Sequence, residues 1–203
     1  MSIYAGKAHV SSLASLSDSL SRACSALSAL MGAERPERKP LDSELQELLQ
    51  DSDASARALL GEVERSFITP IDRVLLADLS VGIPDVIERL HGTGHLILEH
   101  RVGSIPEDAV SAMASIERAA EIIGESVRSF GRPRELIPYQ HELRRLMRDA
   151  RHALRRGLGE TVSATPDPRL AQRERDILKQ LERVTDAVDA VAGTLRSVAV
   201  RES

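Results

Sequence analysis

The sequence predicts an all-α protein, a six-helix up-down bundle. Aromatic residues make up only 2% of the 203 residues and tryptophan is absent, so leucine, valine, isoleucine and alanine must fill the interior. Strands draw on aromatic and β-branched residues, so this composition favours helices that pack on helices. Apolar residues also recur every three or four positions in long segments, as they do on one face of a helix. Breaks that contain proline divide these segments three and three.

The first two helices are predicted on either side of a charged linker. The first runs from His9 to about Met31, and Gly32 to Pro40 forms the linker that ends it. Ser43 and Gln46 have the spacing of a capping box, which predicts that the second helix starts there and runs to about Ser66. The apolar residues of the first helix that recur at helical spacing are Leu13, Leu16, Leu20, Cys24, Leu27 and Leu30.

A proline turn introduces the third helix. Proline at the first helical position costs no hydrogen bond, so Pro70 is expected at N1 with Thr69 as the N-cap. Asp72 would then occupy N3, against the positive end of the helix. The helix is expected to reach Val102, with a kink where Pro84 removes one backbone bond.

The last three helices complete a single predicted domain, residues 1–203, whose halves are 1–103 and 104–203. Ser104 is expected to cap the fourth helix, and Gly131 to Pro133 should end it. The fifth is predicted from Pro138 to Leu158, and the linker Gly159 to Pro168 leads to the sixth. The sixth helix has an apolar seam typical of antiparallel bundles, formed by Ile177, Leu181, Val184, Val188, Val191, Leu195 and Val198.

Charge and composition exclude several function classes. A net charge of -4 implies no bulk attraction to nucleic acid. The one cysteine, Cys24, cannot form an internal disulfide and fits a reducing cytosol, and its place on an apolar stripe is typical of a structural thiol. The sequence shows no signal peptide and no apolar run of about 20 residues. We expect a cytoplasmic protein that reaches the inner face of a membrane only through a partner. Because there is no phosphate loop or nucleophile elbow, we expect no enzyme.

Two stretches carry a family resemblance. The junction Ser66-Phe67-Ile68-Thr69-Pro70-Ile71-Asp72-Arg73 and the closing helix, with Leu181-Glu182-Arg183-Val184-Thr185-Asp186, resemble the PhoU-like family, in the branch that accompanies Pit-type phosphate transporters. The resemblance implies an architecture of two three-helix halves. It also implies a non-enzymatic regulator that docks on a Pit-type transporter, with carboxylates on several helices that could bind a divalent or ferric ion.

The carboxylates of the sixth helix form the best candidate metal site. Residues four apart share a helix face, so Glu182 and Asp186 can reach one cation, and Asp189 continues the stripe. The alternative is an ordinary solvated face. Elsewhere the resemblance implies ligands at Asp53, Asp85, Glu88 and Asp149. Three positions where the family pattern has an acid hold Leu49, Pro84 and Arg145, and an arginine competes with a metal by forming the ion pair itself.

Two further surfaces are candidates. Glu88, His91, His95 and Glu99 follow one face of the third helix and could bind zinc or a similar ion. Gly92 and Gly94 loosen this turn, which favours a polar interhelical face instead. The arginines of the fifth helix suggest contact with an acidic transporter loop or with anionic lipid headgroups. The favoured alternative for these arginines is pairing with the acidic stripe of the sixth helix, within a plain helical scaffold or across a homodimer. For the protein as a whole, a metal-binding helical bundle for ion sensing or storage is a further alternative. The proposed partner-binding residues are Arg144, Arg148, Arg151 and Arg155.

Overall fold

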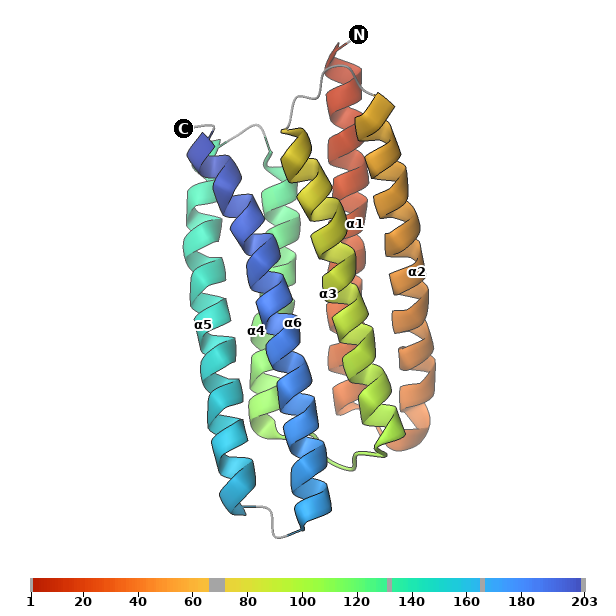
Figure 1. The fold of residues 1–203 in the computed structure, drawn as a ribbon, viewed down its shortest axis with the longest axis vertical. Helices are drawn as coiled ribbons and strands as arrows, with labels where there is room; N and C mark the ends of the chain where they lie inside the picture. Colours follow the sequence, from red (N-terminus) through yellow and green to blue (C-terminus); the bar gives the residue numbers. More distant parts are fainter. Residues whose placement is uncertain (1, 66–71, 131–132, 165–166, 202–203) are drawn as a thin grey trace.

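The chain forms a six-helix bundle in which helices consecutive in sequence run in opposite directions (Figure 1). The computed structural model describes residues 2–65, 72–130, 133–164 and 167–201, and this part of the chain contains no strand. The predicted all-α architecture is therefore confirmed. The helices are α1 (Ser2–Gly32), α2 (Arg35–Arg65), α3 (Arg73–Glu99), α4 (Glu107–Arg128), α5 (Pro133–Ala164) and α6 (Pro168–Arg201).

The bundle consists of two three-helix halves. Helices α1, α2 and α3 contact one another, and so do α4, α5 and α6, while α1 contacts α4 and α3 contacts α6 across the middle. In Figure 1, α3 and α6 lie side by side at the centre, with α2 beyond α3 and α5 beyond α6. We call the surface that α2, α3, α6 and α5 share the four-helix face. The assignment of residues 1–103 and 104–203 to one domain stays a prediction.

One hydrophobic core passes through both halves, and the predicted seams line it. All six residues predicted for the first helix are fully buried. Of the α6 seam, the six residues from Ile177 to Leu195 are buried, whereas the Val198 side chain lies outside the described residues. Burial of this kind stabilises the fold by about 1.5–3 kcal/mol for each large aliphatic side chain. Leucine, isoleucine, valine and alanine thus do fill the interior, as the composition predicts.

The linker predicted between the first two helices is wrong, because α2 already begins at Arg35. Its first turn contains Pro36, and a helix tolerates proline there since the first N–H groups have no intrahelical partner. Pro40 and the predicted Ser43 capping box both lie inside the helix, so the helix does not start at Ser43. Pro36 and Pro40 therefore belong to the N-terminal part of α2 and not to a loop.

Arg38, also in the predicted linker, forms hydrogen bonds to the α1–α2 loop and to the α3–α4 loop. Its side chain is only 4% exposed, and its guanidinium donates to the carbonyls of Ala33 at 3.0 Å, Val102 at 2.6 Å and Gly103 at 3.5 Å. Burial lowers the pKa of Arg38. A single buried cation thus satisfies backbone acceptors of the α1–α2 and α3–α4 connections.

The other helix boundaries also differ from the predictions. Asp72 is the N-cap of α3 and accepts from the Val74 N–H at 2.9 Å, so it is not at N3; Thr69 and Pro70 lie outside the described residues. The predicted Ser104 cap is wrong, because Pro106 precedes α4 without a side-chain cap bond. Helix α3 continues through Pro84 and ends at Glu99.

Helix α5 is longer than predicted at both ends, and the linker predicted from Gly159 is mostly helical. Packing explains the extension better than propensity does, since tertiary contacts supply most helical stability in proteins. Gly157 permits a close approach to α4, because an added Cβ would lie 2.9 Å from the Cβ of Asp108. Gly159, where the linker was predicted to begin, is therefore compatible with the helix, and Gly157 fits its packing against α4.

Candidate functional site

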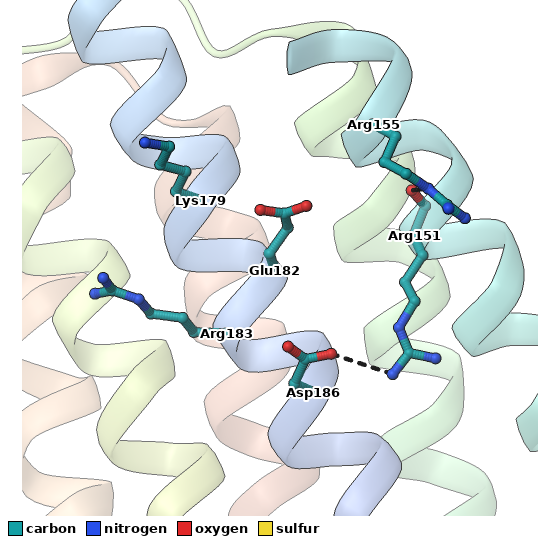
Figure 2. A pocket seen from close by; sticks show the side chains of 6 residues that line it. All are labelled: Arg151, Arg155, Lys179, Glu182, Arg183 and Asp186. Carbon is teal, nitrogen blue, oxygen red and sulfur yellow. Dashed lines mark hydrogen bonds and ion pairs between the residues drawn. The ribbon is translucent and has the colours of Figure 1, made fainter. Parts of the chain in front are cut away.

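The predicted acidic stripe and the α5 arginines meet in a groove between α5 and α6. The groove has a volume of about 470 Å³ and lies open on the four-helix face (Figure 2). Glu182 lies on the α5 side of α6, whereas Lys179 and Arg183 extend to the other side of α6. The residues that line it are Arg151, Arg155, Lys179, Glu182, Arg183 and Asp186.

Arg151 binds two members of the acidic stripe. Its Nη2 atom lies 3.1 Å from Asp186 Oδ1 and 2.9 Å from Asp189 Oδ2. The hydrogen bond to Asp189, the stronger cause, and that to Asp186 raise the pKa of Arg151. Asp189 also lies 3.4 Å from Arg196 Nη1, so it sits between two guanidinium groups. The predicted pairing of the α5 and α6 charges is confirmed for Arg151.

A second groove, of about 610 Å³, lies between α2 and α3 on the same face. Asp85 is held there by Arg89 one turn later, through bonds of 2.9 and 3.0 Å. This bidentate pair raises the pKa of Arg89. The floor is largely apolar, and the residues that line the groove are Leu49, Asp53, Ala56, Arg57, Leu60, Ser80, Val81, Pro84, Asp85 and Glu88.

The other arginines of α5 either form an ion pair or are exposed to solvent without one. Arg145 pairs with Asp149 at 3.2 Å, which confirms the ion pair predicted at this position. Arg144 and Arg148 are exposed and form no ion pair with another described residue, whereas Arg155 Nε donates to the Arg151 carbonyl at 3.2 Å. Exposed pairs such as Arg145–Asp149 contribute about 0.2–1 kcal/mol. Arg144 and Arg148 therefore present positive charge to solvent.

The histidine face of α3 is interhelical, as predicted. Asp42 of α2, which sequence reasoning did not identify, lies 3.9 Å from His91 Nε2 and 3.6 Å from His95 Nδ1. Asp42 Oδ1 is buried and accepts no hydrogen bond within the described structure. His95 Nε2 also lies 3.6 Å from Glu99. The histidines thus face a carboxylate of the neighbouring helix.

A third depression, at the end of the bundle where α4, α5 and α6 meet, contains a buried carboxylate. Asp108 is 7% exposed, and Arg156 donates to its Oδ1 through both Nε, at 2.9 Å, and Nη2. This bond raises the pKa of Arg156. Asp108 and Gly157 both line the depression, whose volume is about 460 Å³. The pair joins α4 to α5.

The seven nominated metal ligands are spread over four helices, α2, α3, α5 and α6. Within residues 2–65, 72–130, 133–164 and 167–201, no three histidine, cysteine or acidic side chains converge on a point that could hold an ion. Asp85, Asp149, Asp186 and Asp189 each face a guanidinium. The side chains of Asp53, Glu88 and Glu182 form no hydrogen bond or ion pair with another described residue. Metal binding at these seven positions stays a prediction.

Comparison with solved structures identifies the fold. A PhoU-like protein from Shewanella oneidensis MR-1 superimposes with a TM-score of 0.79 at 13% sequence identity, over 95% of this chain and 99% of that one. The chain has a PhoU-like fold. A second Shewanella oneidensis structure, described as a putative PhoU-like phosphate regulatory protein, gives a TM-score of 0.72 at 14% identity with the same coverage.

A sequence relative supports the resemblance found in the sequence. A protein of Rhizobium meliloti (strain 1021), named "Putative pit accessory protein", is 25% identical over 187 residues, which cover 88% of this chain and 86% of the relative. No protein-family model matches the chain. The predicted resemblance to PhoU-like proteins and to the Pit-associated branch is thereby confirmed. Among the described residues, no helix is long and apolar enough to span a membrane.

Proposed function

We propose that this PhoU-like protein is a non-enzymatic regulator of phosphate transport that docks on the inner face of a Pit-type phosphate transporter. The sequence relative carries the proposal, because the name "Putative pit accessory protein" associates a protein of the same length class with a Pit transporter. The PhoU-like phosphate regulatory protein of Shewanella oneidensis, similar over nearly the whole chain, supports the same reading.

The docking surface is the open part of the α5 arginine stripe. Arg144 and Arg148 lie one turn apart, are exposed, and have no carboxylate partner among the described residues. Arg155 extends the stripe, and Arg151 is already engaged by Asp186 and Asp189. Unpaired guanidinium groups bind carboxylates in bidentate fashion, so an acidic transporter loop is the partner that this surface fits. Such complementarity raises the association rate and makes binding depend on salt.

A matched pair of charge-reversal variants tests the proposal. Arg144→Glu with Arg148→Glu should abolish recovery of the transporter in a pull-down and change phosphate uptake as deletion of the protein does. Arg169→Glu with Arg173→Glu reverses two exposed charges near the start of α6 and should leave both readouts unchanged. Unaltered phosphate uptake in the deletion strain, with no transporter recovered by the unmodified protein, would refute the function itself.

A further inference from the structure

A cluster of three titratable side chains joins α2 to α3. His91 and His95 lie one turn apart on α3, and Asp42 of α2 faces both, 3.9 Å from His91 Nε2 and 3.6 Å from His95 Nδ1. Asp42 lies roughly 16 Å along α2 from Asp53, at 1.5 Å per residue. None of the three residues lines the α2–α3 groove or belongs to the nominated carboxylates. The cluster is therefore a feature separate from them.

Gly94 allows α2 to come close enough to form this cluster. Helix α3 is continuous through Gly94, and a Cβ at this position would lie 3.0 Å from Leu45 Cδ1 and 3.5 Å from Asp42 Oδ1. The absence of a side chain thus permits the close approach of the two helices. Because residues four apart share a helix face, His91 and His95 are both directed toward the same carboxylate.

The Asp42 carboxylate lacks a hydrogen-bond partner at one oxygen. Its side chain is 17% exposed, and Oδ1 is buried and accepts no hydrogen bond from a described residue. Both contacts with the histidines are too long for hydrogen bonds, which span about 2.7–3.2 Å. A carboxylate oxygen removed from water is unfavourable unless a donor or a cation faces it. The cluster thus holds a negative charge that a bound cation would match.

The spacing of the three groups fits the ligands of a zinc ion. Zinc binds imidazole nitrogen and carboxylate oxygen at about 2.0–2.2 Å, so two ligands of a tetrahedral ion lie roughly 3.4 Å apart. The observed separations of 3.6 and 3.9 Å are closer to this value than to a hydrogen bond. Two histidines four apart on one helix face are a recurring zinc-binding arrangement. In addition, His95 Nε2 lies 3.6 Å from Glu99, and a metal-bound histidine usually turns its second nitrogen toward a carboxylate.

We propose that Asp42, His91 and His95 bind one zinc ion, which links α2 to α3. His91 binds through Nε2, His95 through Nδ1 and Asp42 through a carboxylate oxygen, and water completes the tetrahedron. In the described conformation these side chains do not converge on one point. The His95 side chain is 56% exposed, so its ring can turn toward the ion without disturbing the core. Two nitrogen ligands favour zinc over Mg²⁺, which prefers oxygen.

Calorimetric titration of the untagged, metal-free protein with Zn²⁺ tests the site. We expect one Zn²⁺ per chain at neutral pH, and an excess of Mg²⁺ should not displace it. Loss of a ligand should weaken binding at least about tenfold, in each of the variants Asp42→Asn, His91→Gln and His95→Gln. The control, His141→Gln with His152→Gln, removes two exposed histidines of α5 and should bind Zn²⁺ as the unmodified protein does.

Two further readouts accompany the titration. Binding should weaken as pH falls from about 7.5 to 5.5, because histidine must be neutral to bind a metal. Zn²⁺ should also raise the melting temperature of the unmodified protein but not that of His95→Gln, whose folding circular dichroism checks.

No binding by the unmodified protein at 100 μM Zn²⁺ would overturn the proposal. Unchanged affinity in any of the three ligand variants, loss of binding in the control, or displacement by Mg²⁺ would overturn it as well. None of these measurements involves the transporter, and the three ligands lie on α2 and α3, away from the docking arginines of α5. The outcome is therefore independent of the proposed function.

Discussion

Replacing Gly157 by alanine should destabilise the bundle relative to the same change at Gly159, two residues further along α5. An alanine Cβ at position 157 would lie 2.9 Å from the Cβ of Asp108 and 3.1 Å from Leu178 Cδ2, and Cβ atoms essentially never approach so closely. At position 159 nothing lies within 4 Å of the added atom. The two variants thus differ in packing while sharing the helix and the chemical change.

The expected difference follows from the contacts. Glycine to alanine inside a helix gains about 1 kcal/mol of propensity, which is the same in both variants and cancels in the comparison. Overpacking at position 157 costs roughly 1–3 kcal/mol, because Asp108 is buried and held by Arg156 and so cannot move aside freely. Gly159→Ala should therefore stabilise the protein by about 1 kcal/mol, and Gly157→Ala should be about 1–3 kcal/mol less stable than Gly159→Ala.

Urea unfolding followed by circular dichroism measures this difference as a change of midpoint at constant slope. For a domain of this size the two melting temperatures should differ by about 2–4 °C for each kcal/mol. If both variants shift stability in the same direction and by the same amount, Gly157 is not a packing glycine, and the close approach of α4 and α5 does not limit stability.

Three further predictions concern other buried or paired groups. Cys24 is fully buried, so a thiol reagent should label it only in urea. Burial and, to a smaller extent, the charge of Glu117 raise the pKa of the Cys24 thiol in the folded protein. The free energy of unfolding should therefore fall as pH rises above about 9, where the thiol ionises only in the unfolded chain. Arg151→Leu frees Asp186 and leaves Asp189 with Arg196 as its remaining guanidinium partner, beside Glu182. Calorimetry should therefore show tighter Mn²⁺ binding than in the unmodified protein, and equal affinity would exclude this stripe as a latent ligand set. Arg38→Met leaves three backbone carbonyls without their donor and should lower the free energy of unfolding by about 2 kcal/mol or more, measured in urea against Arg35→Met as the exposed control.

The sequence predicts the interior of this protein better than its ends. The seams of α1 and α6 are visible because burial imposes a helical repeat on the apolar residues, and the structure confirms them. Helix ends are harder to predict, since proline fits both a loop and a first helical turn. Arg35–Pro40 therefore reads as a linker in the sequence, whereas in the structure it forms the start of α2.

For the candidate site, local pairs are predictable and long-range pairs are not. Arg145 and Asp149 are one turn apart, so their ion pair follows from helical geometry alone. The contact of Arg151 with Asp189 joins positions 38 residues apart, and its geometry requires the packing of α5 against α6. Asp42 beside His91 and His95 was missed for the same reason, because no spacing in the sequence connects α2 to α3.

On the four-helix face, the α5–α6 groove is lined by four cationic side chains and two carboxylates, whereas the α2–α3 groove is lined by three carboxylates and one arginine. The linings of the two grooves thus differ in charge, although the protein has a net charge of -4. This difference can orient the protein as it approaches a negatively charged partner, before any contact forms. The field of the partner attracts the basic α5–α6 groove and repels the acidic α2–α3 groove. At ionic strengths near 0.15 M this orientation acts only within about 8 Å. An acidic protein can therefore meet an acidic partner in the correct orientation at short range.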